Sequence, residues 1–137
     1  MGYDLIPRNK KTSPIRGNIF SWPIILNETG ACYLFNYGDN SARPGTYVYD
    51  SSRGPGSPVS NDGFNVTSLE ARMLAKLFRG YIFVKRAIRE DWEKRTEEEK
   101  TLLLSFNKKS RPPSEEFIKK IESLADFCEH SGGFRIR

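Results

Sequence analysis

The stretch of sequence that decides the fold is residues 67–92, TSLEARMLAKLFRGYIFVKRAIREDW. Thr67 and Glu70 stand at the spacing of a capping box, in which two side chains close the first turn of a helix. Apolar residues then recur every three or four positions, which is the period of one helix face. They are Leu69, Met73, Leu77, Tyr81, Val84, Ile88 and Trp92, with Leu74, Phe78 and Ile82 widening the stripe. The pattern predicts a long amphipathic helix from about residue 67 whose apolar stripe faces the core.

The opposite face of this predicted helix is basic. It carries Arg72, Lys76, Arg79, Lys85, Arg86 and Arg89. Gly80 lies in its middle, and we expect this glycine to bend or interrupt the helix. Acidic residues follow within 90–99, and such a mixture of signs is typical of a solvated face with intrahelical ion pairs.

Two further helices and a terminal strand are predicted after it. Thr96 and Glu99 repeat the capping pattern ahead of three leucines at 102–104, and Ser114 caps a last helix. The apolar side of that last helix is Phe117, Ile118, Ile121, Leu124, Ala125 and Cys128. Residues 134–137 alternate apolar and basic side chains, which is typical of a half-buried edge strand.

The amino-terminal half is rich in turns and is expected to supply the rest of a sheet. Residues 3–6 favour a short strand, and residues 20–23 favour a brief helix that Gly30 ends. Residues 31–37 and 46–49 are aromatic or β-branched with turn chemistry between them, so they are predicted to pair as antiparallel strands.

These elements predict an α+β fold, a small antiparallel sheet covered by two or three helices. With 137 residues and 15.7 kDa, the chain has the size of one domain spanning 1–137. Within it, residues 1–18 form a basic arm with a short strand. Residues 19–66 hold a short helix, strands and a Gly/Ser/Pro-rich loop, and residues 67–137 form the helical part with the terminal strand.

The composition excludes several kinds of chemistry. No stretch is apolar enough for a membrane span, and no secretory signal begins the chain, so we expect a soluble cytoplasmic protein without membrane contact. Cys32 and Cys128 lie far apart, and His130 is the single histidine, which favours a helix-capping role for it. The sequence therefore predicts no metal site, no cofactor and no catalytic residue, and favours a protein that is not an enzyme.

The segment at residues 51–63, SSRGPGSPVSNDG, is the strongest candidate for a binding site. A glycine-rich loop that leads into a helix amino terminus offers backbone N–H groups and the positive end of the helix dipole to a phosphate. Against this, Ser60 to Gly63 also fit a structural turn whose side chains bond their own backbone. The predicted phosphate-binding residues are Arg53, Ser57, Ser60, Asn61, Asp62, Gly63, Thr67 and Arg72, and Trp22, Tyr47 and Tyr49 are predicted to stack on a base.

Three segments together resemble a family of small uncharacterised proteins of bacteriophages and bacteria. They are MGYDL at residues 1–5, SPVSNDGF at 57–64 followed by Val66, Thr67, Glu70 and Ala71, and FCEHSGGF at 127–134. The resemblance implies interference with host defence, for instance by a small oligomeric protein that sequesters a nucleotide immune signal in the host cytoplasm. It assigns no catalytic residue.

Three classes of function stay open at this point, all consistent with a net charge of +5. The first is capture of a small anionic ligand, a nucleotide in particular, by a binding protein that could be a homo-oligomer. The second is inhibition of a host defence or nucleic-acid-processing protein through the basic helix face. The third is nucleic-acid binding, although no standard nucleic-acid-binding motif is present.

Overall fold

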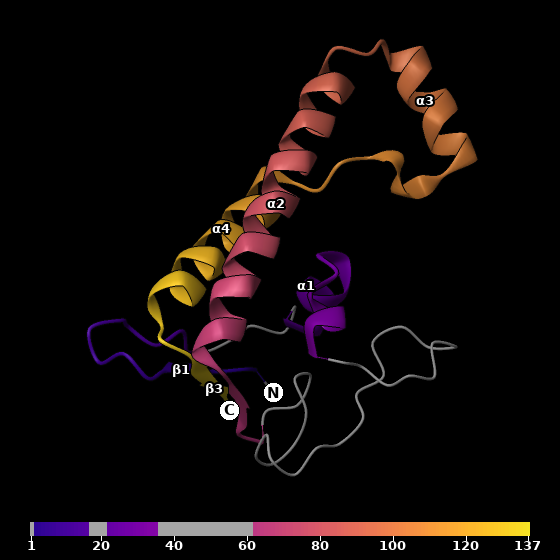
Figure 1. Ribbon diagram of the computed structural model, residues 1–137. Helices are drawn as coiled ribbons and strands as arrows, with labels where there is room; N and C mark the ends of the chain where they lie inside the picture. Colours follow the sequence, from indigo (N-terminus) through magenta and orange to yellow (C-terminus); the bar gives the residue numbers. More distant parts are fainter. Residues whose placement is uncertain (1, 17–21, 36–61) are drawn as a thin grey trace.

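The computed structural model describes residues 2–16, 22–35 and 62–137, and it has the predicted α+β architecture (Figure 1). A small antiparallel sheet lies at one end, and two long helices rise from it. In chain order the elements are β1 (Leu5–Pro7), α1 (Trp22–Glu28), the 3-10 helix η1 (Ala31–Phe35), β2 (Phe64–Val66), α2 (Ser68–Glu93), α3 (Glu97–Phe106), the 3-10 helix η3 (Lys108–Ser110), α4 (Glu115–His130) and β3 (Phe134–Ile136).

The sheet has the strand order β1-β3-β2, and both pairs are antiparallel. Leu5 on one side and Phe64 on the other lie opposite Ile136, so β3 is the central strand. The prediction of an edge strand at the carboxy terminus was therefore wrong. Alternation of apolar and polar side chains shows that one face of a strand is covered, but it does not report how many neighbours the strand has.

The predicted strand at residues 31–37 is not present in the described part of that segment. Ala31–Phe35 instead forms the 3-10 helix η1, with Ala31 and Phe35 buried in the core. Aromatic and β-branched residues favour strands because their side chains pack well on a half-buried surface. A short helical turn on the core offers such a surface too, so these residues do not distinguish the two. The partner strand expected at residues 46–49 lies outside the described residues.

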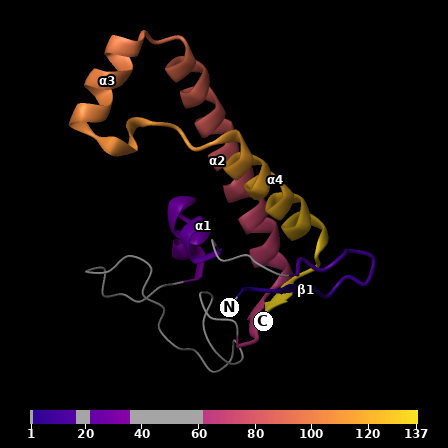
Figure 2. The same cartoon turned by 180° about the vertical axis from the view of Figure 1, so that it is seen from behind.

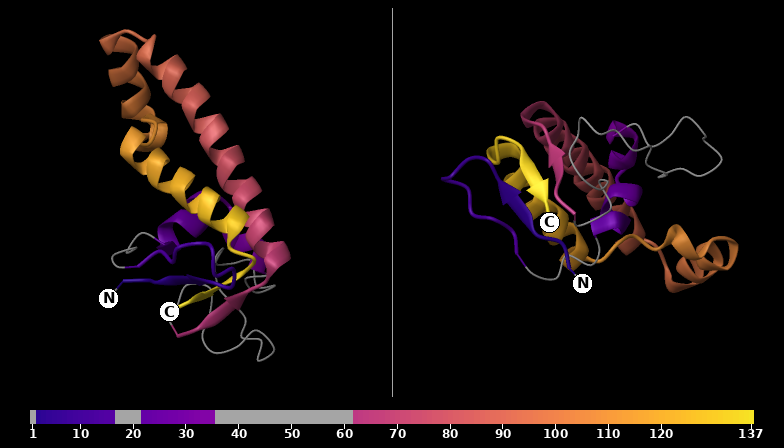
Figure 3. Two further views of the ribbon diagram at one scale, coloured as in Figure 1. Left: turned by 90° about the vertical axis from the view of Figure 1, so that its left-hand side faces the viewer. Right: turned by 90° about the horizontal axis from the view of Figure 1, so that it is seen from below.

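Helices α2 and α4 lie side by side and form the larger layer of the fold (Figures 1 and 3). Helix α2 begins directly after β2, and α4 ends directly before β3, so both helices are anchored at the sheet. Helix α1 contacts η1, and η1 in turn contacts α2. The predicted long helix is confirmed, and it runs through Gly80 without interruption.

Helix α2 buries only part of the apolar stripe predicted for it: Leu74, Phe78 and Ile82 lie in the core, but most of the other stripe residues are exposed. Its buried residues are Ala71, Leu74, Ala75, Phe78 and Ile82, whereas Leu69 is 60% exposed and Leu77 38%. Two apolar faces share the same 3.6-residue period, and periodicity alone cannot tell which of them meets the core.

On α4 the predicted apolar side is confirmed. The buried residues are Ile118, Ile121, Leu124, Ala125, Phe127 and Cys128, and Phe117 is partly buried against them. Thr67, Thr96 and Ser114 cap their helices as predicted, each accepting a hydrogen bond from the backbone three residues on. None of the described helices is long and apolar enough to cross a membrane.

Candidate functional site

Six of the residues predicted to bind a ligand lie outside the described part of the chain. They are Arg53, Ser57, Ser60, Asn61, Tyr47 and Tyr49. Of the others, Asp62 is exposed and Gly63 is buried with a φ of 107°. The Gly63 N–H donates to the carbonyl of Ile136 over 2.8 Å, so this glycine leads the chain into the sheet.

The amino terminus of α2 is closed by the chain itself. The Glu70 carboxylate accepts from the Thr67 N–H over 3.0 Å, and the Thr67 hydroxyl accepts from the Glu70 N–H over 3.2 Å. Gly133 also packs there, since a Cβ atom on it would stand 3.0 Å from the Ser68 nitrogen. The Thr67 and Glu70 N–H groups are thus bonded by the cap itself and are not open to a phosphate.

Trp22 and Arg72 are not brought together with this helix end as a ligand pocket. The Trp22 ring is fully buried and meets Phe134 edge to face at 6.2 Å between ring centroids. It is a core residue with no exposed ring face, and the prediction that it stacks on a base is corrected here. Arg72 is exposed on the first turns of α2.

The basic face of α2 is directed in part at α4 rather than at solvent. Arg79 bonds Asp126 over 2.9 Å and also Glu129, and these two hydrogen bonds raise the pKa of its guanidinium. Arg86 bonds Glu115 and Glu122 over 3.3 and 3.1 Å. Each of these arginines therefore meets two carboxylates of α4, so the expected pairing inside one helix is wrong for both, although both stay more than two-fifths exposed. Pairing inside the helix is confirmed for Arg89 with Glu93.

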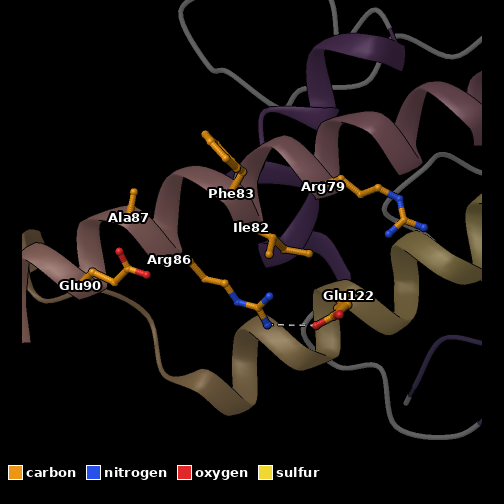
Figure 4. A pocket seen from close by; sticks show the side chains of 7 residues that line it. All are labelled: Arg79, Ile82, Phe83, Arg86, Ala87, Glu90 and Glu122. Carbon is orange, nitrogen blue, oxygen red and sulfur yellow. Dashed lines mark hydrogen bonds and ion pairs between the residues drawn. The ribbon is translucent and has the colours of Figure 1, made fainter.

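An open pocket of about 550 Å³ lies in the groove between these two helices (Figure 4). It is lined by Arg79, Ile82, Phe83, Arg86, Ala87, Glu90 and Glu122. The Glu122 carboxylate already bonds one of its arginines, and Glu90 adds a further negative charge. Because carboxylates compensate both cations, the pocket does not favour a phosphate-bearing ligand.

A second candidate is the segment of residues 96–113, here called the distal arm, which joins α2 to α4 far from the sheet (Figures 1 and 2). Its helix α3 has no buried residue. Leu102 is 58% exposed and Phe106 82% exposed, four positions apart on one side of the helix. A hollow of about 470 Å³ beside Leu102 is lined by Glu97, Glu98, Thr101 and Ser105.

The distal arm contacts α2 near both of its ends, and the Arg89 guanidinium of α2 donates to the Pro113 carbonyl over 2.8 Å. The Lys100 ammonium lies 6.0 Å above the Trp92 ring centroid at the end of α2. Beyond α3, the side chains of Lys108, Lys109 and Arg111 are exposed, and no ion pair is seen for them in the described part of the chain. The arm thus presents an apolar pair beside a basic cluster. The sequence contains both features, but the leucines at 102–104 predicted only a helix and not an exposed apolar surface.

The cysteine and histidine chemistry is structural where it is described. Burial raises the pKa of the Cys128 thiol, which keeps it neutral. The His130 Nδ1–H donates to the Asp126 carbonyl over 2.9 Å, as expected for a residue that caps a helix end. Among the described residues no group of histidine, cysteine and carboxylate side chains could hold a metal ion.

Neither a known protein family, nor a curated protein, nor a solved structure matches this chain.

Proposed function

We propose that this chain is a non-enzymatic binding protein whose distal arm docks on another protein. The proposal rests on α3, a helix with two strongly exposed apolar side chains, Leu102 and Phe106, and none buried. Helices of this length are marginal in water and take most of their stability from packing one apolar side. A partner that covers this pair supplies that packing.

The exposed charges of the arm suggest the chemistry of the partner. Lys108, Lys109 and Arg111 flank the apolar pair on the carboxy-terminal side. Aromatic side chains commonly anchor interfaces in apolar pockets, and surrounding charges speed association and select the partner. The fitting partner is a protein with an apolar pocket bordered by carboxylates. On the resemblance to bacteriophage proteins, we propose that it is a host defence or nucleic-acid-processing protein.

The basic residues proposed to meet an acidic partner are those of the distal arm and not those of α2. Arg79 and Arg86 of α2 are bonded to carboxylates of α4, and an acidic partner would have to displace those bonds. The cations of the distal arm have no such competitors in the described part of the chain. Inhibition of an acidic host protein is therefore assigned to the arm.

The test is quantitative capture from host lysate with three forms of the chain. The wild type and the variant Phe83→Ser should retain the same protein in stoichiometric amount, and Phe106→Ser should lose it. Phe83 is the matched control because it is a phenylalanine of similar exposure, 78%, on α2. The proposal is wrong if Phe106→Ser retains that protein as well as the wild type does.

Capture of a phosphate-bearing ligand is kept as a second proposal. It is supported by the sequence of residues 51–63 and by the net charge of +5. Isothermal titration with nucleotides and cyclic nucleotides tests it, and heat that disappears in Arg53→Ala would support it. Nucleic-acid binding would instead show as a mobility shift that weakens steeply with salt.

A further inference from the structure

Helix α2 has a second apolar face opposite the one in the core, here called the outer face of α2. Its large side chains are Leu69, Met73, Leu77, Val84 and Ile88, and all are exposed. Helix α4 crosses in front of α2 in Figure 2, but no described helix or strand does so in the opposite view of Figure 1. A contiguous row of exposed apolar side chains on a helix is typical of a surface that another chain or element covers.

The outer face is symmetric along the helix axis. Read outward from the point between Gly80 and Tyr81, apolar residues occur at the same separations in both directions. They pair as Leu77 with Val84 and then Met73 with Ile88. Two copies of such a helix that run antiparallel about this point place each apolar side chain opposite another, as an isologous two-fold interface requires.

Gly80 at the centre of this symmetry has no function within one chain that the described contacts show. A Cβ atom there would meet nothing within 4 Å, so alanine would fit. Glycine in a helix interior costs about 1 kcal/mol relative to alanine. A second helix that crosses at this point explains the residue, because the missing side chain lets the two backbones approach closely.

Exposed charges of opposite sign lie near the two ends of the outer face. Arg72 and Glu90 lie on one edge of it, about five helical turns apart. Both are exposed, and no ion pair is seen for either in the described part of the chain. The two-fold arrangement brings Arg72 of one copy and Glu90 of the other to the same end of the contact. A parallel arrangement would instead bring equal charges together.

We infer that the outer face of α2 is the interface of a homodimer, in which two copies of α2 cross antiparallel at Gly80. The occupant of this face is thus a second copy of the chain. The interface is separate from the distal arm, so the dimer presents two arms and can engage two partner molecules.

The test is the mass of the full chain in solution, measured by light scattering and sedimentation from micromolar to millimolar concentration. The wild type should show twice the chain mass of 15.7 kDa. Leu77→Lys places a charge in the seam and should raise the dimer dissociation constant at least about tenfold. Phe106→Ser, on the distal arm, is the matched control and should leave the constant unchanged.

A charge exchange tests the antiparallel arrangement. Arg72→Glu should weaken the dimer, and the double variant Arg72→Glu with Glu90→Arg should restore it toward wild type, because the opposite charges meet again. Both positions are exposed, so neither change should unfold the chain. A wild type of single-chain mass at millimolar concentration would overturn the inference, as would a Leu77→Lys variant that dimerises like wild type. A double variant no better than the single one would overturn the antiparallel crossing.

Discussion

The sheet end of the molecule and the distal arm treat similar apolar side chains in opposite ways. At the sheet end, Trp22, Phe64 and Phe134 are fully buried, and the rings of Trp22 and Phe134 meet edge to face. In the arm, Leu102 and Phe106 are largely exposed and α3 has no fully buried residue. Apolar content therefore does not distinguish the two regions. What differs is whether the chain itself supplies a cover, and this separates residues for folding from residues for binding.

The largest expected effect is at Trp22. Trp22→Ala removes a fully buried ring and should lower the free energy of unfolding by about 3–5 kcal/mol, because the cavity cannot close completely. Urea denaturation followed by circular dichroism measures it. A loss similar to that of an exposed residue, below about 0.5 kcal/mol, would contradict the placement of Trp22 in the core.

Alanine substitutions at two glycines, one tightly packed and one with open space around it, should change stability in opposite directions. Gly133 has a φ of 94°, and a Cβ on it would stand 2.8 Å from the Val66 carbonyl oxygen. Gly133→Ala should therefore lower the free energy of unfolding by about 1–3 kcal/mol. Gly80→Ala, with open space in one chain, should instead stabilise the isolated chain by about 1 kcal/mol while weakening the dimer. Thermal melts at several protein concentrations separate the two effects.

The sequence predicted the elements better than their partners. Helix caps depend only on residues a few positions apart in the sequence. The start of α2 at Thr67 and the start of α4 at Ser114 were therefore predicted correctly. The choice between two apolar faces of α2 depends on which side of it the sheet and α4 pack, and no local pattern contains that information. The central position of β3 likewise depends on residues more than a hundred positions earlier.

The candidate site shows the same division. The sequence presented a leucine run and a basic cluster around residues 102–111, but only the fold shows that no other described element buries them. It also counted Arg79 and Arg86 as an open basic face, because their carboxylate partners lie on α4 and not at helical spacing within α2. Long-range neighbours decide which charges are available for binding.

After the glycine variants, the next largest effect is a pH dependence of stability at Cys128, near the sheet end of α4. Burial raises the pKa of the Cys128 thiol above its ordinary value, so the folded state keeps the proton. The stability that this contributes is complete below the thiol pKa of the unfolded chain, about 8.5, and falls by up to about 1.4 kcal/mol per pH unit above it. Denaturation at a series of alkaline pH values should show a steeper loss for the wild type than for Cys128→Ala.

A smaller effect is expected for the ion pairs between α2 and α4. Arg86→Met removes two bonds to Glu115 and Glu122, but all three side chains are more than two-fifths exposed. Solvent screens such pairs, so the loss should be about 0–1 kcal/mol and should shrink in high salt. A salt-independent loss of several kcal/mol would show that these pairs hold the two helices together.

The smallest effect on stability is predicted for the distal arm. Phe106→Ser should change the free energy of unfolding by less than about 0.5 kcal/mol, because the side chain is 82% exposed and leaves no cavity. Its amides and those of Leu102 should also exchange with solvent much faster than those of Phe78 in the core. A stability loss like that of Trp22→Ala would mean that the arm is covered within the chain. A neutral Phe106→Ser that has lost its captured partner would instead identify the arm as a surface kept for binding.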